Sequence, residues 1–314
     1  MLGRSANGIY WMFRYLERAE NFARLLDTGF RMAMTRDLIA AEEEWRSVIE
    51  TAGMREAYES KNATYTGVQV WNFILRDADN PNSIRTLIGQ VRNNARSVRN
   101  VITSELWEAI NEGYLHTNDT LSRPVSQGNL GHAIASIKRE ATQVRGAMDG
   151  SMLRSDIYNF GRIGSFLERA DSTARILDVK YYLLLPSLSL VGSNLDNAQW
   201  ETILRSLGAE RAYRWLNEGN LNARRIASFL ILDDRFPRSL RFCYDKIRHE
   251  LQNLALEYGE EMNSHEVMRA ADLKLQGRDI NSIFDQGLHE FLTEFVQGNA
   301  EIADAVQQDY RFYA

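Results

Sequence analysis

Cysteine, proline and lysine are scarce in this 314-residue sequence, and each scarcity excludes something. The one cysteine, Cys243, allows neither a disulfide within the chain nor a zinc site built from cysteines, and its apolar neighbours favour a buried thiol. Four prolines and 20 glycines leave few helix breakers, so long helices are expected. Only five of the 37 basic residues are lysines. Either the codon usage of the genome or a demand for planar guanidinium groups, which can bind a carboxylate through two donors, explains this arginine bias.

The sequence also lacks a long hydrophobic run. Its longest apolar stretch, near residues 181–191, is interrupted by Pro186 and is too short to cross a bilayer. Residues 1–14 show no continuous apolar segment of the kind found in signal peptides. A net charge of −5 disfavours a general binder of nucleic acids or anionic membranes. We therefore expect a cytoplasmic protein that binds neither nucleic acid nor membrane.

Familiar catalytic and ligand-binding motifs are missing as well. The sequence has no glycine-rich phosphate loop, no Gly-x-Ser-x-Gly and no His-Glu-x-x-His. Acidic residues have i,i+3 spacing at Glu17 and Glu20 and again at Glu168 and Asp171, but no histidine follows three residues later as in carboxylate di-metal bundles. Arginines interleaved with these acids oppose the binding of a cation. The sequence thus predicts no metal site and no cofactor.

What the sequence does contain is an internal duplication. Residues 16–27 (LERAENFARLLD) realign on residues 167–178 (LERADSTARILD), and eight of the twelve positions are identical. Further matches keep the same order, and they pair 45–58 with 200–213 and 73–92 with 229–248. The shift between the copies drifts only from 151 to 156. The repeating unit is about half the chain, far longer than a solenoid repeat.

The predicted fold is all-α, a helical bundle whose two units, residues 1–150 and 151–314, pack as one body about an approximate two-fold axis. No segment shows the sustained period-2 alternation of a strand. The second copy carries an insertion, roughly 263–286, that is expected to cover one end of the bundle. The long helices are expected in matched sets, near 5–37, 81–113 and 126–149 and near 155–185, 237–262 and 280–310.

Helical periodicity places an apolar stripe and a charged stripe side by side on the first helix of each copy. Apolar residues at spacings of three and four run from Ile9 to Phe30 and from Ile163 to Tyr181. The charged stripe repeats at four matched positions, which are Glu17, Glu20, Arg24 and Asp27, then Glu168, Asp171, Arg175 and Asp178. Such a stripe is usually a solvated boundary, but its recurrence predicts fixed partners. The six tryptophans, at helical spacings among apolar residues, are expected in the core.

Four arginines share one face of the next long helix, and we call them the arginine ladder: Arg85, Arg92, Arg96 and Arg99. Their first expected partner is the carboxylate stripe of the first helix, through buried or half-buried ion pairs. The alternatives are an anionic ligand and plain exposure to solvent. The second copy keeps arginine at the first two positions but has Gln252 and Ala255 at the last two. An anion site is therefore expected in the first copy rather than the second.

Four blocks of residues, spanning nearly the whole chain, resemble the Alpha-E family. They begin with Arg4-x-Ala6-Asn7-x-x-Tyr10-Trp11-x-x-Arg14-Tyr15-x-Glu17-Arg18-Ala19-Glu20, and continue with Asn80-Pro81-Asn82-Ser83-Ile84, Gly161-Arg162-x-x-x-x-Leu167-Glu168-Arg169-Ala170-Asp171 and Asp233-x-x-Phe236-Pro237-Arg238-Ser239-Leu240-Arg241. One departure is Asn93, where the family pattern usually has Glu. The resemblance implies a bacterial all-helical protein encoded beside circularly permuted ATP-grasp ligases and transglutaminase-like proteins.

This setting implies peptide-bond formation or modification, and it supplies no catalytic residue to carry over. We therefore expect a non-catalytic partner or substrate-presenting protein of an ATP-grasp peptide ligase, with a transglutaminase-like protein as a second partner and a peptide or amino acid as a conceivable ligand. The alternative is a helical-bundle enzyme that modifies a peptide or amino acid at the charged cluster. The candidate site residues are Arg14, Glu17, Arg18, Glu20, Arg24, Arg85, Arg92, Arg96, Arg99, Glu168, Arg169, Asp171, Arg175, Asp233, Arg238 and Arg241.

Overall fold

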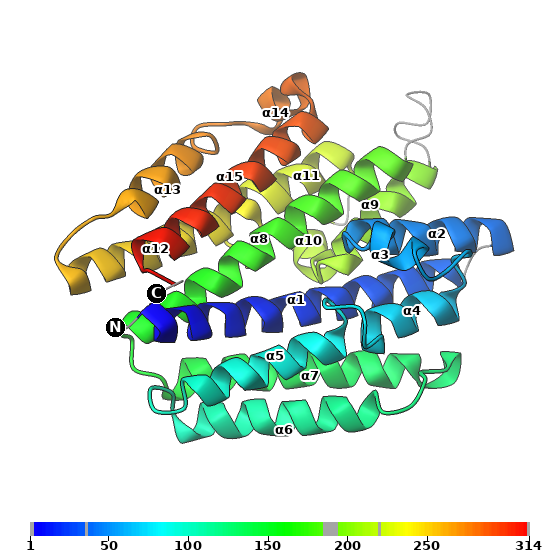
Figure 1. Cartoon of the computed structure of the whole chain (residues 1–314). Coiled ribbons are helices and arrows are strands. Elements are labelled where there is room, and N and C mark those ends of the chain that lie inside the picture. The colour runs from blue at the N-terminus through cyan, green and yellow to red at the C-terminus, as the bar shows by residue number, and fades with distance from the viewer. Residues whose placement is uncertain (1–2, 35–36, 185–193, 219–220, 313–314) are drawn as a thin grey trace. The chain divides into compact units, whose positions relative to one another are not determined.

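All regular secondary structure in the described part of the chain is α-helical, which confirms the all-α fold class (Figure 1). The residues that the computed structural model describes are 3–34, 37–184, 194–218 and 221–312. The chain divides into two compact units, Met1–Ser165 and Phe166–Ala314. The two-fold relation between the copies stays a prediction.

In the first unit, four long helices form a bundle in which α1 and α6 each contact both α5 and α7 (Figure 1). These helices are α1 (Gly3–Ala33), α5 (Ile84–Ser97), α6 (Ser104–Thr120) and α7 (Gln127–Ser151). Three shorter helices lie between α1 and α5 in the sequence, and they are α2 (Leu38–Thr51), α3 (Arg55–Glu59) and α4 (Gly67–Arg76). The first residues of α8, up to Ser165, also belong to this unit.

The second unit begins with the same order of long and short helices, and it has two helices, α13 and α14, where the first unit has α6. Its elements are α8 (Asp156–Leu184), α9 (Asn194–Ser206), α10 (Glu210–Leu216), α11 (Ala223–Leu232), α12 (Leu240–Tyr258), α13 (Asn263–Leu273), α14 (Ile280–Gln286) and α15 (Leu288–Asp309). Helix α13 packs between α12 and α15, while α14 contacts α11 and α15. Helices α13 and α14 thus stand between α12 and α15, where the first unit has α6 between α5 and α7, so the predicted insertion near 263–286 was wrong.

Matched local signals shape the matched elements of the two copies. Gly53 and Gly208 follow α2 and α9 with φ angles of 67° and 65°, where glycine avoids the clash of a Cβ. Both helices end in the Schellman pattern of two backbone hydrogen bonds. After α2, the N–H groups of residues 53 and 54 donate to the carbonyl oxygens of residues 50 and 49. After α9, those of residues 208 and 209 donate to the carbonyl oxygens of residues 205 and 204. Ser83 and Ser239 then cap the N-termini of α5 and α12 through their hydroxyl groups.

The apolar stripes predicted on the first helix of each copy are buried over most of their length. From Ile9 to Leu26 and from Ile163 to Leu177, each apolar stripe residue is at most 2% exposed. Phe30 is half-buried, and the side chain of Tyr181 lies outside the described residues. Gly164 lets α8 approach α1 closely, because a Cβ at this position would lie 2.4 Å from the Tyr10 carbonyl oxygen. Cys243 is buried, as predicted. No described helix is long and apolar enough to span a bilayer, and part of the stretch 181–191 lies outside the described residues.

Three expectations about helices and core were wrong. The predicted helix 81–113 is two helices, because Thr103 caps a new helix with its hydroxyl group after the turn that follows α5. The predicted helix 280–310 is broken at Gly287, whose φ of 104° is incompatible with a continuous helix. Trp215 is not a core residue, since it is 84% exposed.

Candidate functional site

Two carboxylates of α1 are buried and held by arginines. Glu17 and Glu20 are 1% and 0% exposed. Arg145 of α7 lies 3.4 Å from Glu17 Oε2 and forms a closer ion pair with Glu20 Oε2. Arg24, one turn along α1, donates from Nε and Nη2 to Glu20 Oε1 at 2.9 and 2.6 Å. Both oxygens of Glu20 therefore face guanidinium groups, as expected for a pair that stabilises the bundle.

The partner that we expected for these carboxylates was the arginine ladder, and this expectation was wrong. The ladder lies on the face of α5 that meets α6, whereas α5 buries its apolar residues Ile84, Leu87, Val91 and Ala95. Periodicity correctly placed Arg85, Arg92 and Arg96 on one face, but Arg99 lies in the turn that follows α5. It could not say which neighbouring helix that face meets.

Neutral side chains of α6 hold the ladder. Arg85 Nε donates to Asn118 Oδ1 at 2.9 Å, and Arg92 Nε donates to Asn111 Oδ1 at 2.8 Å. Arg92 also lies over the ring of Tyr114, with 4.7 Å from its guanidinium carbon to the ring centroid. Because each of these hydrogen bonds uses Nε, the two Nη groups of both arginines remain outside them.

The last two members of the ladder are exposed. Arg99 lies over the ring of Trp107 at 5.3 Å. Arg96 forms no ion pair or hydrogen bond with the residues that the structure describes. Helix α6 has acidic residues nearby, Glu105 and Glu108, yet neither pairs with the ladder in the described structure. The ladder is thus an array of four guanidinium groups whose described partners carry no charge.

In the second copy, Arg241 and Arg248 match Arg85 and Arg92, and both have acidic partners. Arg241 contacts Asp245 at 3.0 Å and Asp272 at 3.2 Å, and Arg248 contacts the same two aspartates at 2.8 and 3.4 Å. Asp272 comes from α13 and is 2% exposed. The spacing of Asp245, four residues after Arg241, was visible in the sequence. Asp272 could be found only from the fold.

Two matched arginines, Arg18 after Glu17 and Arg169 after Glu168, each contact the segment that precedes the next long helix of their own copy. Arg18 donates to Asn82 Oδ1 at 3.1 Å, and Arg169 donates to the Pro237 carbonyl oxygen at 3.2 Å. Arg14, one turn before Arg18, donates to the Tyr10 hydroxyl and lies over the Trp11 ring at 5.0 Å. These contacts tie α1 and the start of α5 together in one unit, and α8 and the start of α12 in the other.

The remaining candidate residues of the second copy also lie in local contacts. Asp171 and Arg175 form an i,i+4 ion pair at 2.7 Å, and Glu168 is buried at 5% exposed. The Arg238 main-chain oxygen accepts a hydrogen bond from the buried Thr173 hydroxyl at 2.8 Å. Glu168 is thus buried as Glu17 is, and Thr173 links α8 to the segment before α12.

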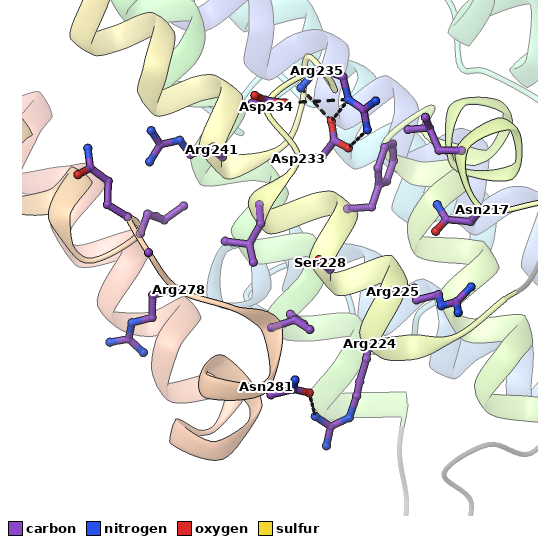
Figure 2. A pocket seen from close by; sticks show the side chains of 17 residues that line it. Asn217, Arg224, Arg225, Ser228, Asp233, Asp234, Arg235, Arg241, Arg278 and Asn281 are labelled. Carbon is purple, nitrogen blue, oxygen red and sulfur yellow. Dashed lines mark hydrogen bonds and ion pairs between the residues drawn. The ribbon is translucent and has the colours of Figure 1, made fainter.

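Asp233 and Arg241 line a cavity of the second unit that also contains other arginines (Figure 2). Asp233 is held by Arg235, whose backbone N–H and Nη2 lie 2.8 Å from its two oxygens. Burial raises the pKa of Asp233, but the hydrogen bonds from Arg235 outweigh burial, so the net pKa lies below its ordinary value. Within the described residues, no three His, Cys, Asp or Glu side chains are grouped so that they could hold a metal ion.

Sequence reasoning missed the partners that decide the role of the charged residues. Arg145 was not a candidate, although it contacts both buried glutamates of α1. Asn111 and Asn118 were also missed as ladder partners. Their i,i+7 spacing on α6 matches the spacing of Arg85 and Arg92 and could have suggested them. No signal in the sequence pairs Arg145 with Glu20.

Comparison with known proteins places the whole chain in one family of helical proteins. A family model described as a predicted alpha-helical domain with a conserved ER motif matches residues 1–311. Uncharacterized proteins of Mycobacterium bovis and Mycobacterium tuberculosis are 22% identical to the chain over 315 residues. That match covers 94% of this chain but 35% of each relative, so the chain spans about a third of their length. No solved structure matches the chain.

Proposed function

The chain belongs to the Alpha-E family, and we propose that it is a non-catalytic partner or substrate-presenting protein of an ATP-grasp peptide ligase. The ATP-grasp ligase and a transglutaminase-like protein are the partners that the family resemblance implies. The arginine ladder is the proposed docking surface, and an acidic segment of the ligase is the proposed occupant.

The observation that carries this proposal is that the described partners of the ladder are uncharged side chains. Asn118 and Asn111 each orient one guanidinium through its Nε atom, so the Nη donors of Arg85 and Arg92 stay available. Fixed guanidinium groups with unused donors bind carboxylates through two hydrogen bonds, which gives both orientation and affinity. From Arg85 to Arg96 the ladder extends about 17 Å at 1.5 Å per helical residue, and Arg99 follows in the turn after α5. That length suits an extended acidic segment better than a small molecule.

The second copy supports the same assignment by contrast. There Asp245 and Asp272 neutralise Arg241 and Arg248 within the unit. Where these arginines have a structural role, carboxylates of the same chain neutralise them. Because α6 supplies only amides and rings to the ladder in the described structure, the ladder is suited to a carboxylate from outside.

The contacts of Glu20 weigh against the enzyme alternative. An acid–base catalyst must have a carboxylate oxygen within reach of a substrate proton. Both oxygens of Glu20 instead contact arginines, Arg24 on one side and Arg145 on the other. The length of the relatives also favours a module that works beside other domains, since 94% of this chain matches 35% of each of them.

The test measures complex formation with the circularly permuted ATP-grasp ligase of the same genome. The two proteins are mixed at about micromolar concentration, where a specific complex is populated, and analysed by size-exclusion chromatography and biolayer interferometry. We expect co-elution that weakens with added salt, and a marked loss of affinity in Arg92→Gln/Arg96→Gln/Arg99→Gln. The matched control is Arg123→Gln, which removes an exposed arginine outside the ladder.

Ligase assays with and without this chain complete the test. We expect the chain to raise ligase activity or to change its choice of peptide, while it shows no activity alone. If the two proteins elute as independent species and the ligase is fully active by itself, the proposal is wrong. The same chromatography with the transglutaminase-like protein tests the second partner.

A further inference from the structure

The second unit contains an open cavity of about 930 Å³ that is rich in arginine (Figure 2). One wall is α11, and a second is the segment from Leu275 to Asn281, which leads into α14. The loop after α11, with Asp233 and Arg235, forms a third side. Five arginines and two aspartates line it, so the lining carries an excess of positive charge.

The arginines of the cavity fall into two groups according to their partners. Arg235 pairs with Asp233 at 2.8 Å, and Arg241 pairs with Asp245 and Asp272, which do not line the cavity. These two guanidinium groups are therefore neutralised within the protein.

The other three arginines have no carboxylate partner in the described structure. Arg224 donates to the Asn281 side-chain oxygen at 2.9 Å, and Arg278 donates to the Gln286 side-chain oxygen at 2.5 Å. The exposed Arg225 side chain has no ion pair or hydrogen bond with the described residues. Three positive charges thus surround one cavity and meet only neutral groups.

The position of two of these arginines is unfavourable for the helix that bears them. Arg224 and Arg225 lie in the first turn of α11, which contains no acidic residue. The partial positive charge of a helix N-terminus repels cations there and attracts anions. The first copy has Val68 and Gln69 at the matched positions, so the repeat does not require arginine. An anion in the cavity would offset this repulsion.

The rest of the lining indicates the kind of ligand. Phe229, Leu232, Leu275 and Ile280 give the cavity apolar surface, and Ser228 adds a hydroxyl group. We propose that the cavity binds a small molecule with at least two phosphate or carboxylate groups, held by Arg224, Arg225 and Arg278. The segment between α13 and α14 supplies Arg278 and the second wall, so this site lies wholly in the second copy and is separate from the ladder of the first. It stands whether or not the ladder binds a ligase.

Isothermal titration calorimetry of the full chain with two probes tests this site. Pyrophosphate represents multivalent phosphates, and citrate represents multivalent carboxylates. We expect one saturable site for at least one probe, and the tighter probe identifies the anion chemistry. The variant Arg225→Gln/Arg278→Gln should weaken that binding about tenfold or more, since each removed guanidinium takes a charge-assisted hydrogen-bond pair with it.

The matched control is Arg211→Gln, which removes an exposed arginine of the same unit that does not line the cavity. It should bind the probes as the wild type does, and circular dichroism should show all variants folded. Absence of binding for both probes at low salt, or equal binding in the double variant and the wild type, overturns the proposal. The double variant should still co-elute with the ligase, so failure of this site and failure of the ladder are distinguishable.

Discussion

Arg145 on α7 holds Glu20 on α1 in an ion pair in which the glutamate side chain is fully buried and the arginine is 21% exposed. The same guanidinium reaches Glu17, and Arg24 closes the other side of Glu20. A buried charge is costly unless it is paired. The stripe of α1 that was read from the sequence is therefore part of the internal structure of the first unit.

Replacement of Arg145 by methionine should strongly destabilise the first unit. The change leaves the Glu17 and Glu20 carboxylates without their partner on α7, and breaking a buried pair costs about 3–5 kcal/mol. The matched control is Arg175→Met, which breaks an i,i+4 pair whose arginine is 49% exposed and should cost about 0.2–0.5 kcal/mol. Urea unfolding measures both. Equal losses in the two variants would contradict the structural role of Arg145.

Replacement of two ladder residues should have little effect on stability. In Arg96→Gln/Arg99→Ala, the first side chain loses no described contact and the second loses its position over Trp107, which is worth about 0.5–1 kcal/mol at an exposed site. The melting temperature should therefore stay close to that of the wild type, while ligase binding falls. A loss as large as that of Arg145→Met would mean that the ladder stabilises the fold.

Gly164 should not tolerate a larger residue. Alanine at this position would place its Cβ 2.4 Å from the Tyr10 carbonyl oxygen, and a backbone atom cannot move aside cheaply. We expect a loss of about 1–3 kcal/mol from overpacking. The control is Gly146→Ala on α7, where a Cβ meets nothing within 4 Å. There the higher helix propensity of alanine should raise the free energy of unfolding by about 0.5–1 kcal/mol. In thermal unfolding we expect Gly164→Ala to lower the melting temperature and Gly146→Ala to raise it.

The fold class was predictable because its signals are local. Few prolines, the stripe of three- and four-residue spacings and the serine caps at Ser83 and Ser239 each act within one helix. The candidate site was less predictable, because partners depend on which helices become neighbours. The spacing of Arg85, Arg92 and Arg96 places them on one face of α5, but only the bundle shows that this face meets Asn111 of α6, and that Arg145 of α7 meets Glu20.

His289 should make stability depend on pH near neutrality. The hydrogen bond with Asp178, at 2.5 Å, raises the pKa of His289 above its ordinary value, with a smaller contribution from the Asp178 and Glu290 charges, while burial opposes the shift. A raised pKa in the folded state means that the protonated form stabilises the fold. The contribution is complete below the unfolded pKa of about 6.5 and is lost as pH rises through the folded pKa.

The measurement compares urea midpoints at pH 6 and pH 8 in the wild type and in His289→Gln. The wild type should lose more stability between these values than the variant does, because the variant has no imidazolium to lose. His132→Gln is the control, since this exposed histidine has no described ion pair. The same pH dependence in His289→Gln as in the wild type would show that the pair with Asp178 contributes nothing.

Acidic partners for the ladder should stabilise the chain and abolish its docking. Asn111→Asp/Asn118→Asp replaces two amides by carboxylates of the same shape, 2.8 Å from Arg92 Nε and 2.9 Å from Arg85 Nε. The first copy would then resemble the second, where aspartates pair with the matched arginines. Two partly exposed ion pairs should add about 0.2–1 kcal/mol each. Ligase affinity should fall, although every arginine of the ladder is still present.

A control with the same net charge separates local neutralisation from a general effect of charge. Thr142→Glu/Gln143→Glu adds two carboxylates on an exposed part of α7, away from the ladder. We expect this variant to bind the ligase nearly as the wild type does, because charges separated by more than about 8–10 Å are largely screened at physiological salt. If both variants lose affinity equally, the ligase responds to the total charge of the chain. If the asparagine variant keeps full affinity, the ladder is not where the ligase binds.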